Sequence, residues 1–338
     1  MSYTLDIYLR RAAPARNFLD YALFVTFFPH LVAGPIMRPT ELVPQFEQPR
    51  RASARQLAFG LGLMTLGLFE KVVLADSFLA PAVERVYDRG AVPGFVDGWM
   101  GTLAFGGQIF CDFAGYSTTA IGAALCLGFA MSDNFRFPYA AIGFSDFWRR
   151  WHITLSAWLR DYLYIPLGGN RHGPFRTYCA LMGTMLLGGL WHGASWTFVA
   201  WGGLHGLYLA AERWLRTRFP GYAPGPAMLL AFGLLTYLLI NLTWVFFRAA
   251  SFGTAWSVLR AMFGANAGAK PLLDTFSLIS VGLIVAGMLA THAWMRRKTL
   301  ESVLAQAPAA WLAMVWGTLA FLVVIAQGSG NAFIYFQF

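Results

Sequence analysis

The stretch that decides the fold class is residues 227–247, AMLLAFGLLTYLLINLTWVFF, which contains no Asp, Glu, Lys or Arg. Residues 276–295 and 309–327 are equally free of these four residue types. A helix needs roughly 20 apolar residues to cross the hydrocarbon core of a bilayer. Charged residues make up only 12% of the chain, whereas soluble domains contain about 25%. The sequence therefore predicts an all-α, polytopic transmembrane helical bundle.

Three other apolar segments predict less regular crossings. Residues 57–75 form a further predicted span. Residues 95–131 are rich in glycine, which permits close helix packing, and are long enough for a tilted helix plus a partial re-entry, or for two short spans. Residues 177–211 are too long for one ordinary span, so we expect a crossing followed by a buried or re-entrant continuation.

Two segments predict helices that do not cross the membrane. Residues 21–37 are apolar but contain Pro29, Gly34 and Pro35, which favours a re-entrant segment packed against protein. Residues 134–176 mix charged and aromatic side chains, which is typical of helices lying at the membrane interface. No linker or repeat is visible, so residues 1–338 are interpreted as one membrane-embedded domain.

The net charge of +9 comes from short basic clusters beside the apolar stretches. This distribution is typical of the positive-inside rule and argues against nucleic-acid binding. If the clusters at residues 213–218 and 296–298 are cytoplasmic, residues 248–274 form an external loop. The chain is then a multi-pass membrane protein with the lipid bilayer as its surroundings.

His192 is the sharpest candidate for chemistry. It lies between small residues and two indoles in residues 188–196, GGLWHGASW. Glycines beside an imidazole allow a substrate or another backbone to come close. Apolar surroundings favour the neutral imidazole, which can act as a general base toward a hydroxyl. A histidine that only forms a structural hydrogen bond between helices explains the same pattern equally well.

Other ionisable residues give weaker signals. His152 lies among charges and indoles at the predicted interface, and composition alone favours an interfacial residue with no chemical role. His205 follows His192 by 13 residues, about 220° around a helix, so it is interpreted as a packing or hydrogen-bonding residue unless the helix breaks. Asp112 is flanked by apolar residues and is expected to pair with an arginine or to line a polar cavity.

Known cofactor and metal motifs are missing from the sequence. It contains no His-Glu-x-x-His, no P-loop and no Gly-x-Ser-x-Gly, and its three cysteines are widely spaced. We therefore predict no metal site and no tightly bound cofactor.

Several motifs together resemble the bacterial membrane-bound O-acyltransferase (MBOAT) family. The pattern looks like that of the branch with the alginate O-acetylation protein and its D-alanyl-transfer relative. The resemblance rests on the following stretches: residues 112–117, DFAGYS; residues 134–139, NFRFPY; residues 147–152, FWRRWH; residues 160–170, RDYLYIPLGGN; and residues 191–194, WHGA.

The resemblance implies that His192 is the family's essential histidine and that His152 is its second characteristic one. Both are therefore expected to be catalytic. The residues expected to contact substrates are Arg149, Arg150, Trp151, Trp191, Asp112 and Tyr116. The resemblance also implies cavities that reach His192 from both faces of the membrane.

By the same resemblance, the chain is expected to transfer an acyl group, with acetyl as the expected group, in a bacterial inner (cytoplasmic) membrane. The donor would be acetyl-CoA or another acyl thioester on the cytoplasmic side, and the acceptor an exported, alginate-like polysaccharide. Periplasmic acetyltransferase or polysaccharide-handling proteins would be its partners. The alternatives are a transporter that relays protons through His192 and Asp112, and a non-catalytic scaffold for an exopolysaccharide machine.

Residues 1–20 match the interior of the family pattern and not its start. The resemblance thus implies that the usual first N-terminal spans are not in this sequence, through either a start codon placed late or a truncated form. For the first alternative, we expect the DNA upstream of Met1 to encode further apolar spans in frame.

Overall fold

The computed structural model describes residues 2–88, 90 and 92–326, and all the regular structure within these residues is helical. The α-helices are α1 Ser2–Tyr8, α2 Phe18–Thr26, α3 Pro39–Phe46, α4 Ala54–Leu68, α5 Ala80–Tyr87, α6 Phe95–Cys126, α7 Phe144–Trp148, α8 Ile153–Leu159, α9 Gly173–His192, α10 Trp196–Arg218, α11 Pro226–Arg248, α12 Phe252–Met262, α13 Thr275–Met295, α14 Leu300–Leu304 and α15 Ala309–Ile325. A π-helical segment, Phe69–Leu79, joins α4 to α5.

Four helical stretches within the described residues are long and apolar enough to cross a membrane: Ala54–Tyr87, Phe95–Cys126, Pro226–Arg248 and Thr275–Met295. The apolar helix α15 is shorter. These helices confirm the predicted all-α membrane bundle. The helices expected at residues 227–247 and 276–295 are present, because α11 and α13 match these ranges to within one residue at each end.

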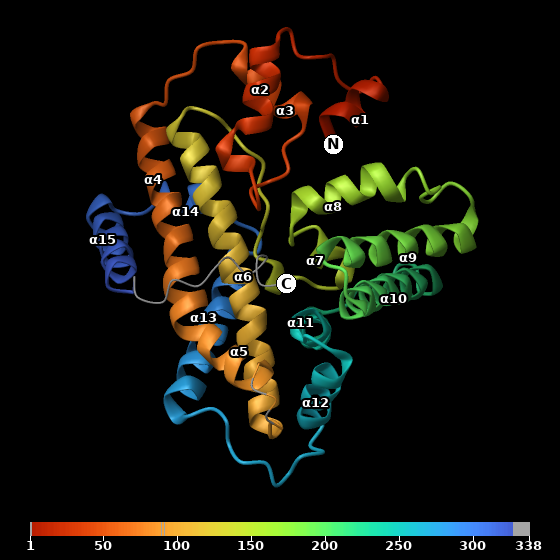
Figure 1. Ribbon diagram of the computed structural model, residues 1–338. Helices are drawn as coiled ribbons and strands as arrows, with labels where there is room; N and C mark the ends of the chain where they lie inside the picture. Colours follow the sequence, from red (N-terminus) through yellow and green to blue (C-terminus); the bar gives the residue numbers. More distant parts are fainter. Residues whose placement is uncertain (1, 89, 91, 327–338) are drawn as a thin grey trace.

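The prediction of a broken segment at residues 95–131 was wrong. The segment forms one 32-residue helix, α6, most of which is buried. The span expected at residues 57–75 is likewise longer, because it continues through the π-helical segment to Tyr87. Figure 1 shows α4 and α6 side by side along the long axis of the molecule.

Two glycine pairs explain why α6 runs straight along α4. A Cβ atom on Gly60 would lie 2.7 Å from the carbonyl oxygen of Gly122, and one on Gly122 would lie 2.5 Å from that of Gly60. The pair Gly67 and Gly115 shows the same reciprocal approach, at 2.3 and 2.5 Å. The two antiparallel helices therefore touch backbone to backbone, an arrangement that small residues allow in membranes.

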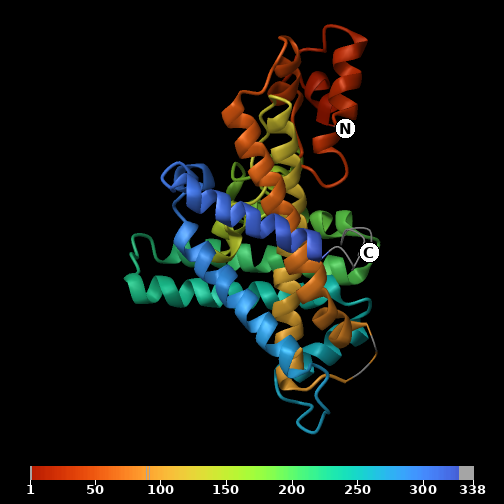
Figure 2. The same cartoon turned by 90° about the vertical axis from the view of Figure 1, so that its left-hand side faces the viewer.

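Residues 177–211 also differ from the prediction of one crossing with a re-entrant continuation. They belong to two antiparallel helices, α9 and α10, which are separated by a break at residues 193–195. In Figure 1 this pair lies across the direction of α4 and α6, and Figure 2 shows α11 crossing that direction as well. The break at residues 193–195 positions the candidate site, because it folds α10 back against α9.

Residues 134–176 do contain the short helices that were expected, α7 and α8. Their position is not purely interfacial, however, because Phe147, Trp151 and His152 are buried in the aromatic core. The segment mixes charged and aromatic residues because some of its aromatic side chains pack into the core while others of its residues are exposed. In residues 21–37, helix α2 ends at Thr26 and a single 3₁₀ turn, Phe28–His30, contains Pro29.

Candidate active site

His192 is the last residue of α9, at the point where the chain turns back. The next helix begins after Ser195, whose hydroxyl accepts a hydrogen bond from the Thr197 backbone N–H at 3.3 Å. A Cβ on Gly193 would lie 2.6 Å from the ring of Phe198, so the turn needs glycine there. The imidazole of His192 therefore lies at a helix end, and residues 193–195 form a tight turn directly after it.

The α9–α10 hairpin is closed by a direct backbone contact. A Cβ on Gly189 would lie 2.3 Å from the carbonyl oxygen of Phe198, and one on Gly202 would lie 2.3 Å from that of Met185. The expectation that glycine near His192 permits close approach of another backbone is confirmed, and the approaching backbone is that of α10.

Replacing Gly189 with alanine should therefore destabilise the hairpin. The new methyl group meets a carbonyl oxygen that cannot move without shifting α10, and forced overpacking of this kind costs about 1–3 kcal/mol. We expect a lower thermal midpoint for Gly189→Ala in detergent. Gly183→Ala on the same helix is the control, since its nearest neighbour would be a leucine methyl at 3.8 Å. Equal midpoints for the two variants would contradict the close contact.

Aromatic rings surround the imidazole of His192 on several sides. Its centroid lies 5.2 Å from the rings of Trp201 and Phe247 and 5.0 Å from that of Trp191. Trp201 and Phe247 are almost fully buried, whereas Trp191 is exposed. The apolar setting expected from the sequence is thus present, and one exposed indole lies at its edge.

His205 lies in the same aromatic cluster as His192, because the helix breaks between α9 and α10 and the chain turns back. It is fully buried, and its ring lies 4.8 Å from Trp201. The Thr243 hydroxyl donates to the carbonyl oxygen of Ile240 at 2.7 Å, so it accepts from Nε2 of His205 at 3.0 Å. Trp201 therefore contacts both histidines, and His205 also forms a hydrogen bond with Thr243.

His152 is buried, not exposed at an interface. It precedes α8 in a left-handed backbone conformation (φ = 43°), and its Nδ1 lies 3.0 Å from Oδ1 of Asn134. The ring of Phe113 meets it edge-on at 4.6 Å. Burial lowers the pKa of His152 well below its usual value, and a positive charge on His192 would lower it further. The two imidazoles are therefore within electrostatic range of each other.

Arg149 and Arg150 have different surroundings. Nε of Arg150 forms an ion pair with Asp146 at 2.9 Å, and the same carboxylate binds Arg296 at 3.0 Å. Although burial raises the pKa of Asp146, hydrogen bonds from the Ile142 N–H and the two arginines hold it below its usual value. Arg149 is exposed and donates to the Ser145 hydroxyl at 2.8 Å. Of the two arginines, Arg149 thus has the more accessible charge.

The remaining predicted residues are spread around the core. Trp151 is 2% exposed and lies between Phe147 and Trp244, with centroid distances of 5.6 and 5.0 Å. Asp112 pairs with a lysine where an arginine was expected, because Nζ of Lys71 lies 2.9 Å from its Oδ1.

Tyr116 donates a hydrogen bond from its hydroxyl to the carbonyl oxygen of Leu31 at 3.3 Å.

Of the predicted residues, His192, Trp191 and His205 lie in one aromatic cluster that includes Trp201.

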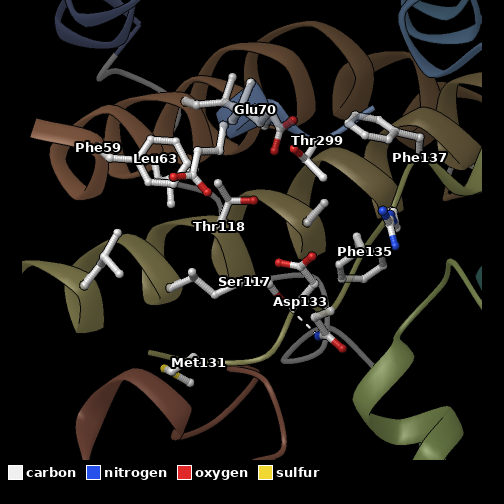
Figure 3. Close-up of a pocket in the computed structure, with 18 of the residues that line it drawn as sticks. Phe59, Leu63, Glu70, Ser117, Thr118, Met131, Asp133, Phe135, Phe137 and Thr299 are labelled. Atoms are coloured by element: carbon white, nitrogen blue, oxygen red, sulfur yellow. Dashed lines mark hydrogen bonds between the residues drawn. The ribbon is translucent and has the colours of Figure 1, made fainter. Parts of the chain in front are cut away.

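A pocket of about 390 Å³ is lined by residues of α4, α6, the segment 130–137 and residues 298–301 (Figure 3). Its wall includes Ser117, Asp133 and Asn134, and Figure 3 shows Ser117 and Asp133 facing the same space. Asn134 is the residue that binds His152. Asn134 lies in the motif at residues 134–139, but the sequence did not indicate its role, because its partners come from distant parts of the chain.

No group of three His, Cys, Asp or Glu side chains that could hold a metal ion occurs within residues 2–88, 90 and 92–326.

Comparison with known proteins identifies the family. The model of the membrane-bound O-acyltransferase family matches residues 13–228, which include His152 and His192. The chain is 46% identical over 263 residues to the probable alginate O-acetylase AlgI of Azotobacter vinelandii, covering 78% of this chain and 51% of that protein. It is 44% identical over 252 residues to the peptidoglycan O-acetyltransferase of Helicobacter pylori, covering 74% and 47%.

A more distant relative is the teichoic acid D-alanyltransferase of Streptococcus thermophilus, which is 30% identical over 214 residues, covering 59% of this chain and 51% of that protein. The chain spans about half the length of the curated relatives it matches. The family model covers well over half of the chain, and the resemblance seen in the sequence is confirmed. The chain belongs to the membrane-bound O-acyltransferase family.

Proposed function

We propose that this chain is the catalytic part of an O-acyltransferase that moves an acetyl group from a cytoplasmic thioester to hydroxyls of an exported polysaccharide. The observation that carries the proposal is the setting of His192, at a helix break, in ring contact with Trp201 and Phe247. Relatives named for alginate and peptidoglycan O-acetylation support acetyl as the group and a polysaccharide as the acceptor.

In the proposed reaction, an imidazole nitrogen of His192 takes the proton of the acceptor hydroxyl while its oxygen attacks the thioester carbonyl carbon. The new C–O bond forms, the C–S bond breaks, and the sulfur leaves as a thiolate that takes the proton from the imidazolium of His192. The products are an ester and a free thiol. General base catalysis by a positioned histidine contributes roughly 10²–10⁴-fold to such a step.

The other predicted residues receive roles that follow from their exposure. Trp191 and Arg149 have exposed side chains and would meet the acceptor and the donor directly. Trp151 and Arg150 would act through the walls of the site, since ring contacts and an ion pair hold them. Asp112 and Tyr116 would shape the polar side of the substrate path from α6. His152 would help to hold the donor at the site.

The donor is proposed to be acetyl-CoA or another anionic acyl thioester that arrives from the cytoplasm. The exposed charge of Arg149 would attract it. Arg149→Gln should raise the KM for acetyl-CoA by roughly two- to five-fold at low ionic strength, the size expected of one exposed charge. The difference should shrink as salt rises, because screening weakens the attraction in the wild type.

Arg218→Gln is the matched control for that prediction, because Arg218 is an exposed arginine at the end of α10 and outside the site. An equal change of KM in both variants would show that only net charge matters. If a cysteine at position 149 is labelled only from the periplasmic face, the proposal that the donor arrives from the cytoplasm is contradicted.

The protein is proposed to lie in a bacterial inner membrane and to deliver the acetyl group to periplasmic proteins that handle the polysaccharide. Reconstitution tests the function. Proteoliposomes with labelled acetyl-CoA on one face and a soluble hydroxylated oligosaccharide on the other should produce labelled ester on the acceptor face. Proton flux in the absence of donor and acceptor, without ester formation, would support a transporter and contradict the proposal.

A further inference from the structure

We propose that Asn134 is a positioning residue that fixes the ring orientation and the tautomer of His152, leaving Nε2 as the nitrogen with a free lone pair. The proposal deepens the function proposed above and rests on it for its kinetic consequences. Its structural part can be tested without any activity. The proposal rests on the direction of each hydrogen bond around Asn134 and on the backbone conformation of His152.

The hydrogen bonds define which way the Asn134 amide points. The Thr154 backbone N–H, which can only donate, bonds to Oδ1 of Asn134 at 3.3 Å. The Thr154 hydroxyl accepts from the Ile36 N–H at 3.0 Å and donates to the same Oδ1 at 2.9 Å. On the other side, Nδ2 of Asn134 donates to the Ser117 hydroxyl at 3.0 Å. The oxygen of the amide therefore faces Thr154 and His152.

The tautomer of His152 follows from that orientation. An amide oxygen has no proton to give, so the contact of 3.0 Å between Oδ1 and Nδ1 requires Nδ1 to carry the hydrogen. A neutral imidazole protonated on Nδ1 has its lone pair on Nε2. Within the described part of the chain, no hydrogen bond reaches Nε2. His152 is thus prepared to accept a proton or a hydrogen bond at that atom.

The backbone holds this arrangement in place from both sides. The Ile153 N–H donates to the carbonyl oxygen of Asn134 at 2.8 Å, and the Arg136 N–H donates to that of Arg150 at 2.9 Å. Between these bonds His152 has φ = 43°, a left-handed conformation that residues with side chains rarely adopt. Strain of this kind persists only where the surroundings impose it, and it concentrates at functional sites.

The groups that face His152 make the amide its main polar partner. Helix α6 presents the ring of Phe113, and the loop presents the ring of Phe135 in a stacked arrangement at 6.4 Å. From the end of α9, His192 is the ionisable group whose charge acts on His152. Asp133 and Arg136 flank Asn134 in the loop, and Asp133 lines the pocket of Figure 3 together with the amide.

Two substitutions separate positioning from packing. Asn134→Leu removes the amide oxygen, so His152 loses the partner that selects its tautomer, and turnover should fall roughly 10²-fold. Asn134→Asp keeps an oxygen acceptor at the same place, and the Ser117 hydroxyl can donate to it. The added negative charge should favour the imidazolium of His152 and raise its pKa by roughly 1–3 units.

The expected kinetic signature is a shift in the pH profile. His152 works as a neutral group, so activity is lost as the pH falls through its pKa. Burial keeps that pKa low in the wild type. Raising it in Asn134→Asp moves the acid limb of the turnover profile to higher pH, which a purely structural role would not do. Asn266→Leu is the control, because Asn266 bonds to the carbonyl oxygen of Pro93, away from the site.

The tautomer itself is measured by ¹⁵N NMR of histidine-labelled protein in lipid, with the His152 signals assigned by their loss in His152→Gln. We expect Nδ1 protonated and Nε2 unprotonated in the wild type, and a mixture or reversal in Asn134→Leu. A wild-type protein protonated on Nε2, or an unshifted acid limb in Asn134→Asp, would overturn the proposal. Absence of any acyl transfer by the wild type would instead refute the proposed function.

Discussion

Substituting glutamine for His192 should reduce O-acetylation of the exported polymer to background while the protein still accumulates in the membrane. Glutamine has a similar length and can still form hydrogen bonds, but it cannot take a proton from a hydroxyl. Loss of a general base slows transfer by roughly 10²–10⁴-fold. Because the substitution lies at a helix end beside a turn, α9 and α10 should remain packed.

The measurement is the O-acetyl content of polymer from producing cells that contain only the variant, together with the membrane level of the protein. His172→Gln is the matched control, since His172 is an exposed histidine that precedes the same helix. The control should acetylate normally. Normal acetylation in His192→Gln would remove this residue from the mechanism, and equal losses in both variants would point to a general effect of histidine replacement.

Lys71→Met should prevent stable folding. Nζ of Lys71 lies 2.9 Å from Oδ1 of Asp76 and 2.9 Å from Oδ1 of Asp112, and both aspartates are buried. Removing the lysine takes away the ammonium group that both buried carboxylates share. Breaking a buried ion pair by removing one partner costs about 3–5 kcal/mol, which is a large part of a typical protein's stability.

Thermal unfolding in detergent and membrane yield measure this effect. Lys270→Met, at an exposed position, should behave like the wild type. Adding Asp112→Asn to Lys71→Met should recover part of the loss, since one of the two carboxylate charges that Lys71 neutralised is then removed. A Lys71→Met protein as stable as the wild type would show that the ion cluster contributes nothing to folding.

Long uncharged helices were the most predictable part of the fold. α11 and α13 could be placed to within one residue, because composition alone determines where about 20 apolar residues can span a bilayer. The 32 residues of α6 could not, since the helix packs along α4 through contacts such as Gly67 with Gly115, which join segments distant in the sequence. Glycine content indicates close packing but does not identify the partner.

The site was predictable in the same partial way. His192 could be selected because it lies between small residues in an apolar stretch, and the structure places it at a helix end. The position of His205 beside Trp201 depended on a break that the sequence did not indicate. The role of Asn134 was not predictable, because its partners Ser117 and Thr154 come from distant segments and meet only after folding.

The central claim, that His192 is the base for acyl transfer, is tested most directly by one comparison in proteoliposomes. The transfer of labelled acetyl from acetyl-CoA to a hydroxylated oligosaccharide is followed for the wild type and for His192→Gln. Equilibrium binding of a non-hydrolysable thioether analogue of the donor is measured on the same preparations. We predict similar donor binding in both proteins and loss of transfer in the variant alone. Transfer at the wild-type rate in His192→Gln, or loss of donor binding that accounts for the whole loss of transfer, would contradict the claim.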